Sequence, residues 1–333
     1  MRPVVAITIG DPAGIGPEVL LRGLPDLLRR QMVPLAVGDA AVLRRTAEAI
    51  GCDSSWAETD GSFLQEGTLN LLCASVITTT SYPVGADSAL CGRASYTYVE
   101  RAVALVREGK AHALVTLPIS KKSWELAGIP YAGHTELLRD RAGASDCAMV
   151  MAADRVRALL LTTHLPLAEA ISRLSIELIC KKATIGQRFL EQIGIKNGTM
   201  ALAAVNPHAG EGGLLGSEET RIFLPAVETL NLRGIRCEGP VPADAVFRMA
   251  ADGKYDLVLC PYHDQAMIPL KTFWFDRLVN ITAGIGMVRT SPGHGTAYDI
   301  AYRGLARWHS FLAACDWACA LLRGSTPPAS AEI

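Results

Sequence analysis

The sequence has no run of lysine and arginine, and its formal net charge is only −1 over 333 residues. Proteins that bind the phosphate backbone of nucleic acids usually present a basic patch, so nucleic acid is not an expected partner. The longest apolar runs, such as "LNLLCASVI", are much shorter than the roughly 20 residues that a membrane-spanning helix needs. The opening "MRPVVAITIG" lacks the long apolar region and cleavage site of a signal peptide. These absences predict a cytoplasmic protein without a membrane partner.

No Cys-x-x-Cys pair occurs among the nine cysteines, and their number is odd. Most of them stand in apolar stretches, which is typical of reduced, buried thiols in a cytoplasmic protein. Cys315 and Cys319 would share one face of a helix, but two such thiols are more typical of a core than of a metal site. We therefore expect neither disulfides nor a cysteine-bound metal.

What the sequence does contain is a repeated alternation of strand-like and helix-like stretches. Half of the residues are hydrophobic and a fifth are charged, as in a globular protein with a sizeable core. Apolar runs of strand length alternate with segments whose apolar residues recur at helical spacing. This alternation predicts an α/β fold with a mostly parallel sheet flanked by helices. The predicted strands cover residues 4–10, 34–39, 111–119, 157–164, 199–208 and 255–263.

Histidines stand at the ends of three of these predicted strands. "LLLTTH" ends at His164, "ALAAVNPH" at His208 and "LVLCPYH" at His263. Parallel α/β sheets bind ligands at the carboxyl ends of their strands, so these imidazoles could converge into an open divalent-metal site. Separate histidines that each satisfy a nearby carbonyl explain the pattern equally well, because no short ligand spacing such as HxxxH supports a metal.

The residues that follow His263 carry further charge. Asp264 could orient an imidazole as a hydrogen-bond acceptor or cap a turn, and Lys271 could pair with a substrate anion or lie on the surface. "GHTELL" places His134 and Thr135 at the start of a helical pattern, where free backbone N–H groups suit phosphate. Alternatively, Thr135 is the N-cap of that helix. The glycine-rich "IGDPAGIGPE" (9–18) is not the GxGxxG fingerprint of dinucleotide-binding folds.

Seven motifs together resemble a known family, the 4-hydroxythreonine-4-phosphate dehydrogenases of pyridoxal phosphate biosynthesis. The resemblance runs nearly end to end and is specific to the superfamily, but close relatives that oxidise threonate- or erythronate-4-phosphate share nearly all of it. The motifs, in the family's order, are "ITIGDPAGIGPE", "AGIPYAGHTELL", "NPHAGEGGLLGSEE", "GPVPADAVF", "YHDQAMIPLK", "VNITAG" and "RTSPGHGTAYDIA".

The resemblance implies a fold like that of isocitrate and isopropylmalate dehydrogenases, with two α/β domains and a cleft between them. The first domain, 1–128 plus 272–333, would be the NAD side, and the second, 129–271, would be the metal and dimer side. Such folds bind NAD without a Rossmann fingerprint, and in this family a dimer partner helps to complete the site. A homodimer is therefore implied.

The family's functional positions fall on particular residues of this chain. The metal ligands fall on the three strand-end histidines, and Lys271 and Asp264 are the candidate catalytic residues. The substrate-binding positions match His134, Thr135, Lys271, Asn280 and Arg289, and the loop that receives the adenosine part of NAD matches His294, Gly295, Thr296 and Ala297.

The implied activity is metal-dependent oxidation of 4-phosphooxy-L-threonine by NAD or NADP, followed by decarboxylation. Zinc, magnesium, manganese and cobalt all accept such a ligand set. A zinc hydrolase and a sugar-phosphate-binding protein are the competing classes. The hydrolase needs no nicotinamide, and the binding protein leaves the three histidines unexplained.

Three positions depart from the family pattern. Gly293 stands where the family usually has Asp before the "HGTA" histidine, which points to an altered affinity for NAD. Leu117 replaces a smaller residue in "TLPISKK" and predicts different local packing. The bulky "FWFDRLVN" (273–280) predicts an influence on substrate choice near Lys271.

Overall fold

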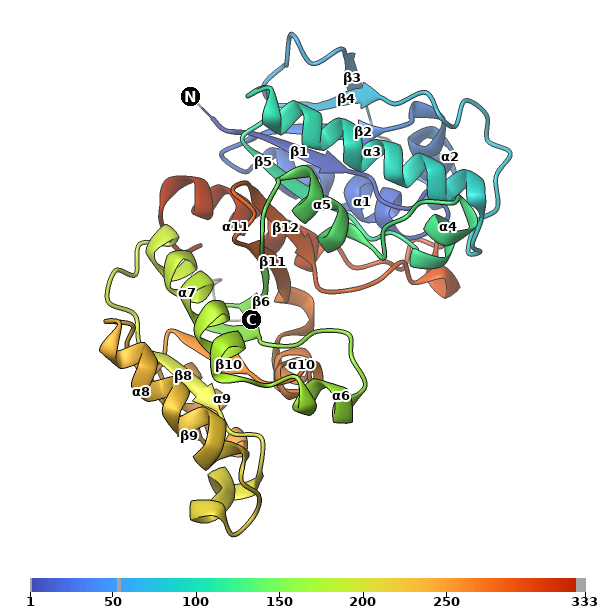
Figure 1. Cartoon of the computed structure of the whole chain (residues 1–333). Helices are drawn as coiled ribbons and strands as arrows, with labels where there is room; N and C mark the ends of the chain where they lie inside the picture. The colour runs from blue at the N-terminus through green and yellow to red at the C-terminus, as the bar shows by residue number, and fades with distance from the viewer. Residues whose placement is uncertain (1, 53–54, 328–333) are drawn as a thin grey trace. The chain divides into compact units, whose positions relative to one another are not determined.

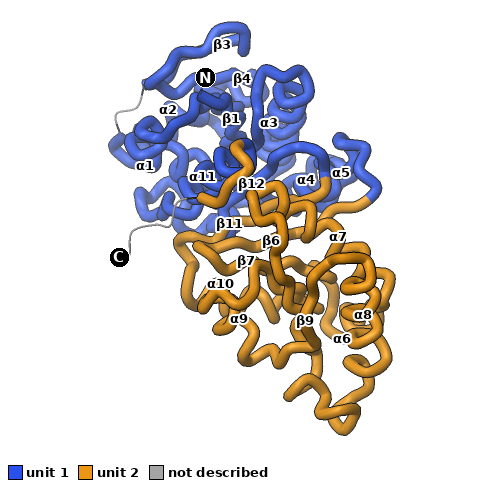
Figure 2. Tube along the Cα trace, turned by 90° about the vertical axis from the view of Figure 1, so that its left-hand side faces the viewer, with its two compact units in different colours: residues 1–145, 285–322 blue, residues 146–284, 323–333 orange. Residues whose placement is uncertain are grey.

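A computed structural model describes residues 2–52 and 55–327. The chain forms two compact units, one within residues 1–145 and 285–322 and the other within 146–284 and 323–333 (Figure 2). The units will be called unit 1 and unit 2. Their boundaries differ from the domain boundaries expected from the sequence, because residues 129–145 fall in unit 1 and residues 272–284 fall in unit 2.

Unit 1 contains a parallel sheet in the order β3-β4-β2-β1-β5-β12. The central strands are fully buried and rich in Val, Ile, Leu and Ala, as expected where helices cover both faces. The strands are β1 (Val4–Thr8), β2 (Val33–Gly38), β3 (Trp56–Thr59), β4 (Leu69–Cys73), β5 (Ala113–Thr116) and β12 (Val288–Pro292).

Helices cover both faces of this sheet. Helix α3 crosses β1, β2 and β5 on one face, and α1 and α2 pack together on the other (Figure 1). A glutamate–arginine pair fastens α5 to α3, since Arg141 donates to both Glu100 carboxylate oxygens at 3.0 Å. The helices are α1 (Gly16–Leu28), α2 (Ala40–Ile50), α3 (Ala89–Arg107), α4 (Lys121–Leu126), α5 (His134–Arg141) and α11 (His309–Arg323).

Unit 2 contains a mixed sheet in the order β11-β6-β7-β10-β8-β9. Strands β7, β10, β8 and β9 run parallel, whereas β6 is antiparallel to both β7 and β11. The pairing with β6 is what holds β11 in unit 2. The strands are β6 (Ala148–Ala153), β7 (Val156–Leu160), β8 (Met200–Ala203), β9 (Cys237–Val241), β10 (Leu257–Cys260) and β11 (Val279–Ala283).

The core of unit 2 lies between its sheet and the helices α9 and α10. Val246 and Phe247 of α9 and Met267 and Leu270 of α10 pack against the apolar side chains of β7, β8 and β10. Helices α7 and α8 lie on the opposite side of the strands (Figure 2). The helices are α6 (Leu167–Ser172), α7 (Ile176–Gln192), α8 (Leu224–Leu232), α9 (Ala243–Ala251) and α10 (His263–Trp274).

The α/β class with mostly parallel strands is confirmed, but the strands are shorter at their carboxyl ends than the sequence predicted. Strand β7 ends at Leu160, β8 at Ala203 and β10 at Cys260, so the three histidines lie in the segments that follow the strands. The predicted strands ran on to the histidines through polar residues such as Thr162 and Asn206 and through Pro207 and Pro261, which have no N–H group for a strand hydrogen bond. Residues 295–306 contain a short 3₁₀ turn at Tyr298–Ile300 and no longer helix.

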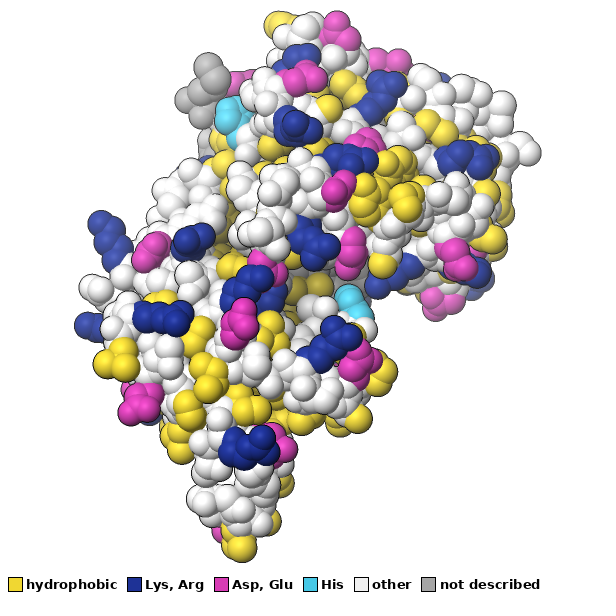
Figure 3. Space-filling model, viewed as in Figure 1, with side chains coloured by type: hydrophobic (Ala, Val, Ile, Leu, Met, Phe, Trp, Pro, Cys, Tyr) yellow, Lys and Arg dark blue, Asp and Glu magenta, His cyan; other side chains and the backbone are white. Residues whose placement is uncertain are grey.

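Basic and acidic side chains are interspersed on the face seen in Figure 3, and neither kind gathers into a large patch there. This mixture agrees with the small net charge. No helix among the described residues is long and apolar enough to cross a membrane. All nine cysteines lie in the described residues and none of them forms a disulfide, and Cys315 and Cys319 are buried in α11 as expected for core residues.

Candidate active site

The three predicted metal-binding histidines follow strands that are neighbours in unit 2. Strand β10 lies between β7 and β8 and runs parallel to both, so His164, His263 and His208 all follow the same edge of the sheet. This is the edge at which parallel α/β sheets present their functional residues. The order of the strands puts His263 between the other two.

His164 and His263 lie close together. The backbone N–H of Leu161 donates to the carbonyl oxygen of Cys260 at 2.9 Å, and the Thr162 hydroxyl donates to that of Pro261 at 2.7 Å. These bonds fasten the segment after β7 to the segment after β10. As a result, the two imidazole centroids are 5.6 Å apart and their planes are tilted by 41°.

Asp264 contacts the ring of His263 directly. Its Oδ1 atom lies 2.6 Å from Nδ1 of His263, a distance typical of a charge-assisted hydrogen bond. With Nδ1 held in this way, Nε2 is the ring atom left to bind a metal or a substrate. This contact matches the prediction that Asp264 orients an imidazole as a hydrogen-bond acceptor.

His208 occupies an unusual loop. It lies in the exposed segment Pro207–Gly213, where residues 208–212 all have positive φ. Such a left-handed backbone is costly for residues other than glycine. The base of the loop is anchored by the buried Glu219, whose Oε1 accepts hydrogen bonds from the backbone N–H groups of Val205 and Asn206 at 2.9 and 2.8 Å.

The three predicted ligands are not gathered into one cluster in the part of the chain that the structure describes. Within residues 2–52 and 55–327, no group of three or more His, Cys, Asp or Glu side chains is arranged to hold a metal ion. The donors themselves suit a divalent metal, since imidazole nitrogens oriented by carboxylates are common ligands. His164 and His263 therefore lie together as two candidate ligands, and within the described residues His208 does not complete a group of three with them.

Two predicted substrate-binding residues of unit 2 lie on different elements. Lys271 is exposed near the end of α10, roughly 12 Å along the helix from His263 at 1.5 Å per residue. Asn280 is in β11, where its Oδ1 atom is buried and has no hydrogen-bond partner. A buried acceptor without a partner is costly, which favours a ligand that donates to it.

Unit 1 brings together His134, Arg289 and Thr116. Arg289 of β12 is 2% exposed and donates from Nε and Nη2 to the Thr116 hydroxyl at 3.2 and 2.6 Å. His134 is the first residue of α5, and its Nε2 atom is buried without a hydrogen-bond partner. Burial, and then the positive charge of Arg289, lower the pKa of His134 well below its usual value of 6.5. The imidazole is therefore neutral beside a buried cation, an arrangement suited to an anion.

The start of α5 also corrects one alternative. The N-cap of this helix is Gly133, not Thr135, and no side chain caps the helix. Thr135 is a half-buried residue of the first turn, next to His134. The hydroxyl of Thr135 is thus not used as a helix cap.

The depressed pKa of His134 predicts how stability depends on pH. Below about pH 6.5 the unfolded chain binds a proton at this histidine and the folded chain does not. Its contribution to stability is therefore present above that pH and lost as the pH falls. We expect His134→Gln to lose less stability than the wild type between pH 7.5 and pH 5.5, as measured by the urea midpoint at each pH. An equal loss in both proteins would contradict a neutral, buried His134.

The predicted adenosine loop, residues 294–297, lies after β12 in unit 1. Ala297 has a left-handed backbone, with φ 40° and ψ 58°. Gly293, the departure from the family pattern, donates its N–H to the Ser310 hydroxyl in α11 at 3.0 Å. Leu117, the second departure, is fully buried, and its Cβ atom would lie 3.3 Å from a Cβ added at Gly16.

The bulky segment 273–280 is the third departure. Trp274 packs against the core of unit 2, whereas Phe273 and Phe275 are 73% and 54% exposed. The influence of this segment on substrate choice stays a prediction.

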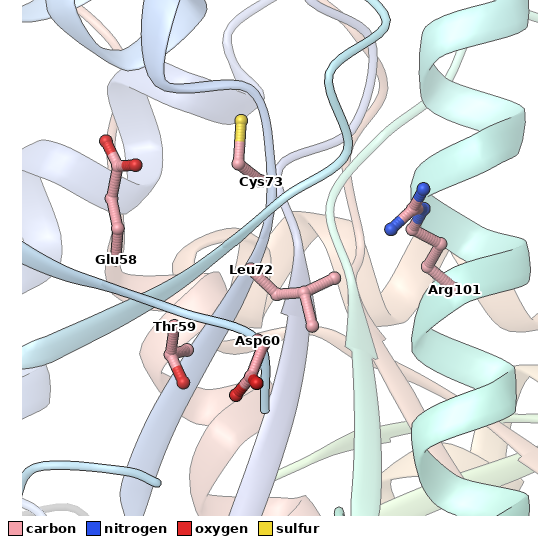
Figure 4. A pocket seen from close by; sticks show the side chains of 6 residues that line it. All are labelled: Glu58, Thr59, Asp60, Leu72, Cys73 and Arg101. Atoms are coloured by element: carbon pink, nitrogen blue, oxygen red, sulfur yellow. The ribbon is translucent and has the colours of Figure 1, made fainter. Parts of the chain in front are cut away.

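A hollow of about 470 Å³ in unit 1 holds none of the predicted site residues (Figure 4). It opens between β3, β4 and α3. Its wall carries both signs of charge, and Glu58 is already paired with Arg44 at 3.2 Å. The lining side chains are Glu58, Thr59, Asp60, Leu72, Cys73 and Arg101.

Several residues of these clusters were not found from the sequence. Thr116 ends β5, so the strand-end rule that selected the histidines could have selected it. Glu219 and Gln265 had no such signal. Gln265 donates to the carbonyl oxygen of Ala204 at 2.7 Å, a contact that depends on how α10 packs beside β8.

The chain is similar in sequence to known proteins over nearly its whole length. The family model of the pyridoxal phosphate biosynthetic protein PdxA matches residues 30–318. A 4-hydroxythreonine-4-phosphate dehydrogenase from Desulforapulum autotrophicum is 40% identical over 322 residues, which is 95% of this chain and 95% of that protein. A D-threonate 4-phosphate dehydrogenase from Cupriavidus necator is 39% identical and covers 94% of this chain and 95% of its own length.

The fold is also similar to that of a solved relative. The crystal structure of 4-hydroxythreonine-4-phosphate dehydrogenase from Klebsiella pneumoniae superposes with a TM-score of 0.87 at 36% identity, covering 97% of this chain and 98% of that one. These relatives are dehydrogenases, which favours an oxidoreductase over the hydrolase and the binding protein.

Proposed function

The chain belongs to the family of the pyridoxal phosphate biosynthetic protein PdxA, and we propose that it oxidises 4-phosphooxy-L-threonine with NAD or NADP. The proposed pathway is the biosynthesis of pyridoxal 5'-phosphate. The observation that carries the proposal is the 40% identity over nearly the whole chain, together with the neutral His134 beside the buried Arg289.

The proposed reaction balances as a two-electron oxidation. The carbon that bears the 3-hydroxyl group loses a hydride to the nicotinamide, and the hydroxyl oxygen loses a proton. The product, 2-amino-3-oxo-4-phosphooxybutanoate, is a β-keto acid. Its C–C bond to the carboxylate then breaks, which releases carbon dioxide and gives 3-amino-2-oxopropyl phosphate.

The residues of unit 1 would bind the charged ends of this substrate. Arg289 presents a planar guanidinium held by Thr116, which suits bidentate contact with a carboxylate or phosphate. His134 and Thr135, in the first turn of α5, suit the phosphate oxygens. The buried Oδ1 atom of Asn280 in unit 2 suits a donor on the substrate.

His164 and His263 would hold one divalent metal ion, which supplies Lewis-acid polarisation of a substrate oxygen when bound. Zinc, magnesium, manganese and cobalt all suit imidazole ligands to some degree. Asp264 would keep the ring of His263 turned toward the metal through its contact with Nδ1. Lys271 is the candidate proton acceptor, and a metal-bound water is the alternative.

A homodimer would complete this site. His208 lies on an exposed loop, and Leu214, just beyond that loop, is 77% exposed. We propose that this loop reaches the His164–His263 pair of a second copy and supplies the third imidazole. We also propose that the protein is cytoplasmic, because nine cysteines without a disulfide agree with a reducing compartment.

Oxidation of D-threonate- or D-erythronate-4-phosphate is the second candidate function. The relative named for D-threonate 4-phosphate is nearly as similar as the one named for 4-hydroxythreonine-4-phosphate, at 39% against 40% identity. The two substrate types differ at C2, which carries an amino group in one and a hydroxyl in the other.

NADH formation measured with each substrate separates the candidates. The protein is first loaded in turn with zinc, magnesium, manganese and cobalt, and each form is assayed with all three phosphorylated acids. We expect the highest kcat/KM with 4-phosphooxy-L-threonine. A clear preference for threonate- or erythronate-4-phosphate would assign the chain to the second function, and no reduced nicotinamide with any of them, from either NAD or NADP, would refute both.

A further inference from the structure

The segment "GDPAGIG", residues 10–16, is the motif that neither the metal pair nor the substrate cluster uses. It connects β1 to α1 and is fully buried. Asp11 is 0% exposed, and its Oδ1 accepts a hydrogen bond from the backbone N–H of Ala13 at 2.8 Å. A buried carboxylate needs partners to offset its desolvation, and those partners show what the segment does.

One partner comes from the residues just after the predicted adenosine loop. The Tyr298 hydroxyl donates to Oδ2 of Asp11 at 2.9 Å. Burial raises the pKa of Tyr298, so its hydroxyl remains a proton donor at neutral and moderately alkaline pH. The carboxylate of Asp11 thereby holds the C-terminal end of the loop.

The backbone of the segment holds the middle of the same loop. The N–H of Ile15 donates to the carbonyl oxygen of Thr296 at 2.9 Å. At Gly14 an added Cβ would lie 3.0 Å from both Cβ and O of Thr296. The approach of the two backbones is therefore so close that glycine fits at position 14 and a larger residue displaces the loop.

A third segment, residues 85–87, also contacts the residues around Tyr298. Oδ1 of Asp87 lies 3.2 Å from the Tyr298 hydroxyl and shares its single proton with Asp11, and the N–H of Gly85 donates to the carbonyl oxygen of Ala13 at 2.8 Å. Gly85 has φ +72°, and an added Cβ would lie 2.8 Å from the carbonyl oxygen of Tyr298. Residues 11–15 and 85–87 thus both contact residues 296–298, and these two segments together will be called the cradle.

We propose that this cradle is a positioning device that fixes the loop 294–297 in the shape that binds the dinucleotide cofactor, with Tyr298 as its central positioning residue. The proposal rests on the assignment of loop 294–297 to the cofactor. Ala297 needs such support because its backbone is left-handed, a conformation that a free loop seldom adopts. A loop held in its binding shape loses less entropy on binding, so the cradle raises the affinity for the cofactor.

The test removes the hydroxyl of Tyr298 and keeps its ring. Tyr298→Phe is expected to raise the Kd for NADH, measured by fluorescence titration of the metal-loaded protein, by about tenfold, as for loss of a hydrogen bond to a charged group. The KM for NAD should rise to the same extent, whereas kcat and the KM for the phosphorylated substrate change less than about twofold.

Two further variants sharpen the test. Gly14→Ala, which pushes directly on Thr296, is expected to weaken NADH binding more than Tyr298→Phe does. Tyr255→Phe is the matched control, because it removes a tyrosine hydroxyl that donates to a carboxylate, Glu238, at 2.9 Å in unit 2. The control should bind NADH as the wild type does.

The outcomes separate this proposal from the proposed reaction. Unchanged NADH binding in Tyr298→Phe overturns the cradle, as does an equal loss in kcat, both KM values and thermal stability, which a merely structural role produces. A wild type that binds no NADH overturns it too. The wild type could bind NADH tenfold better than Tyr298→Phe and yet oxidise none of the phosphorylated acids. That result would support the positioning role of the cradle and refute the proposed substrate.

Discussion

Replacement of His263 with alanine is expected to abolish metal binding and to reduce kcat/KM by about a thousandfold or more, as expected when a metal ligand and its Lewis-acid chemistry are lost. His263 is the middle member of the strand-end histidines and the one that pairs with His164 at 5.6 Å between centroids. Metal content per chain after dialysis, measured by elemental analysis, and NADH formation are the readouts. His309→Gln is the control, because His309 is an exposed residue of unit 1 that stacks on Trp308.

Mixed dimers show whether His208 acts on its own chain or on a second one. His208→Ala and His263→Ala should each be inactive alone. If the loop of one copy completes the pair of the other, each mixed dimer keeps one intact site of its two, and random mixing gives about a quarter of wild-type activity. If both histidines serve the same chain, every site in a mixed dimer is broken and no activity returns. Full activity of a chelated, metal-free preparation would refute the metal role altogether.

Replacement of Arg289 with lysine is expected to raise the KM for the phosphorylated substrate by roughly a hundredfold, which corresponds to about 2.7 kcal/mol, in the range of a lost charge-assisted bidentate contact. The lysine keeps the charge but loses the planar fork of the guanidinium. Steady-state kinetics at saturating NAD measure the effect. Because Arg289 is 2% exposed, a urea unfolding curve must accompany the kinetics.

The control for Arg289 is its hydrogen-bond partner. Thr116→Val removes the hydroxyl that accepts from Nε and Nη2 of Arg289 but leaves the guanidinium in place. We expect a smaller rise in KM, about tenfold, because the cation is present but less well oriented. An unchanged KM in Arg289→Lys would show that this arginine does not bind the substrate anion.

The α/β alternation of the sequence was enough to select the three strand-end histidines as candidates, whereas the substrate-binding candidates came from the family resemblance. In a parallel sheet the carboxyl ends of the strands share one edge, so His164, His208 and His263 could be grouped before any coordinates were known. The structure adds the reason that His263 is central, which is the position of β10 between β7 and β8. Strand order is a tertiary property and cannot be deduced from a local pattern.

Other features depended on packing that no local pattern encodes. The cradle joins Asp11 to Tyr298, residues separated by 287 positions in the chain. The anchor on the His208 loop requires Glu219 to be buried beside Asn206, although the sequence around it looks like an ordinary polar loop.

The sequence by itself determined the alternation of strands and helices, the placing of histidines at strand ends and the membership of a family, because each is written in local spacing or in motif order. Only the tertiary structure decided which histidines pair, that His134 is neutral beside Arg289, and that the loop 294–297 is held by residues near the start of the chain. These depend on the local dielectric environment and on contacts between distant segments. Burial and proximity arise only when the sheet is assembled.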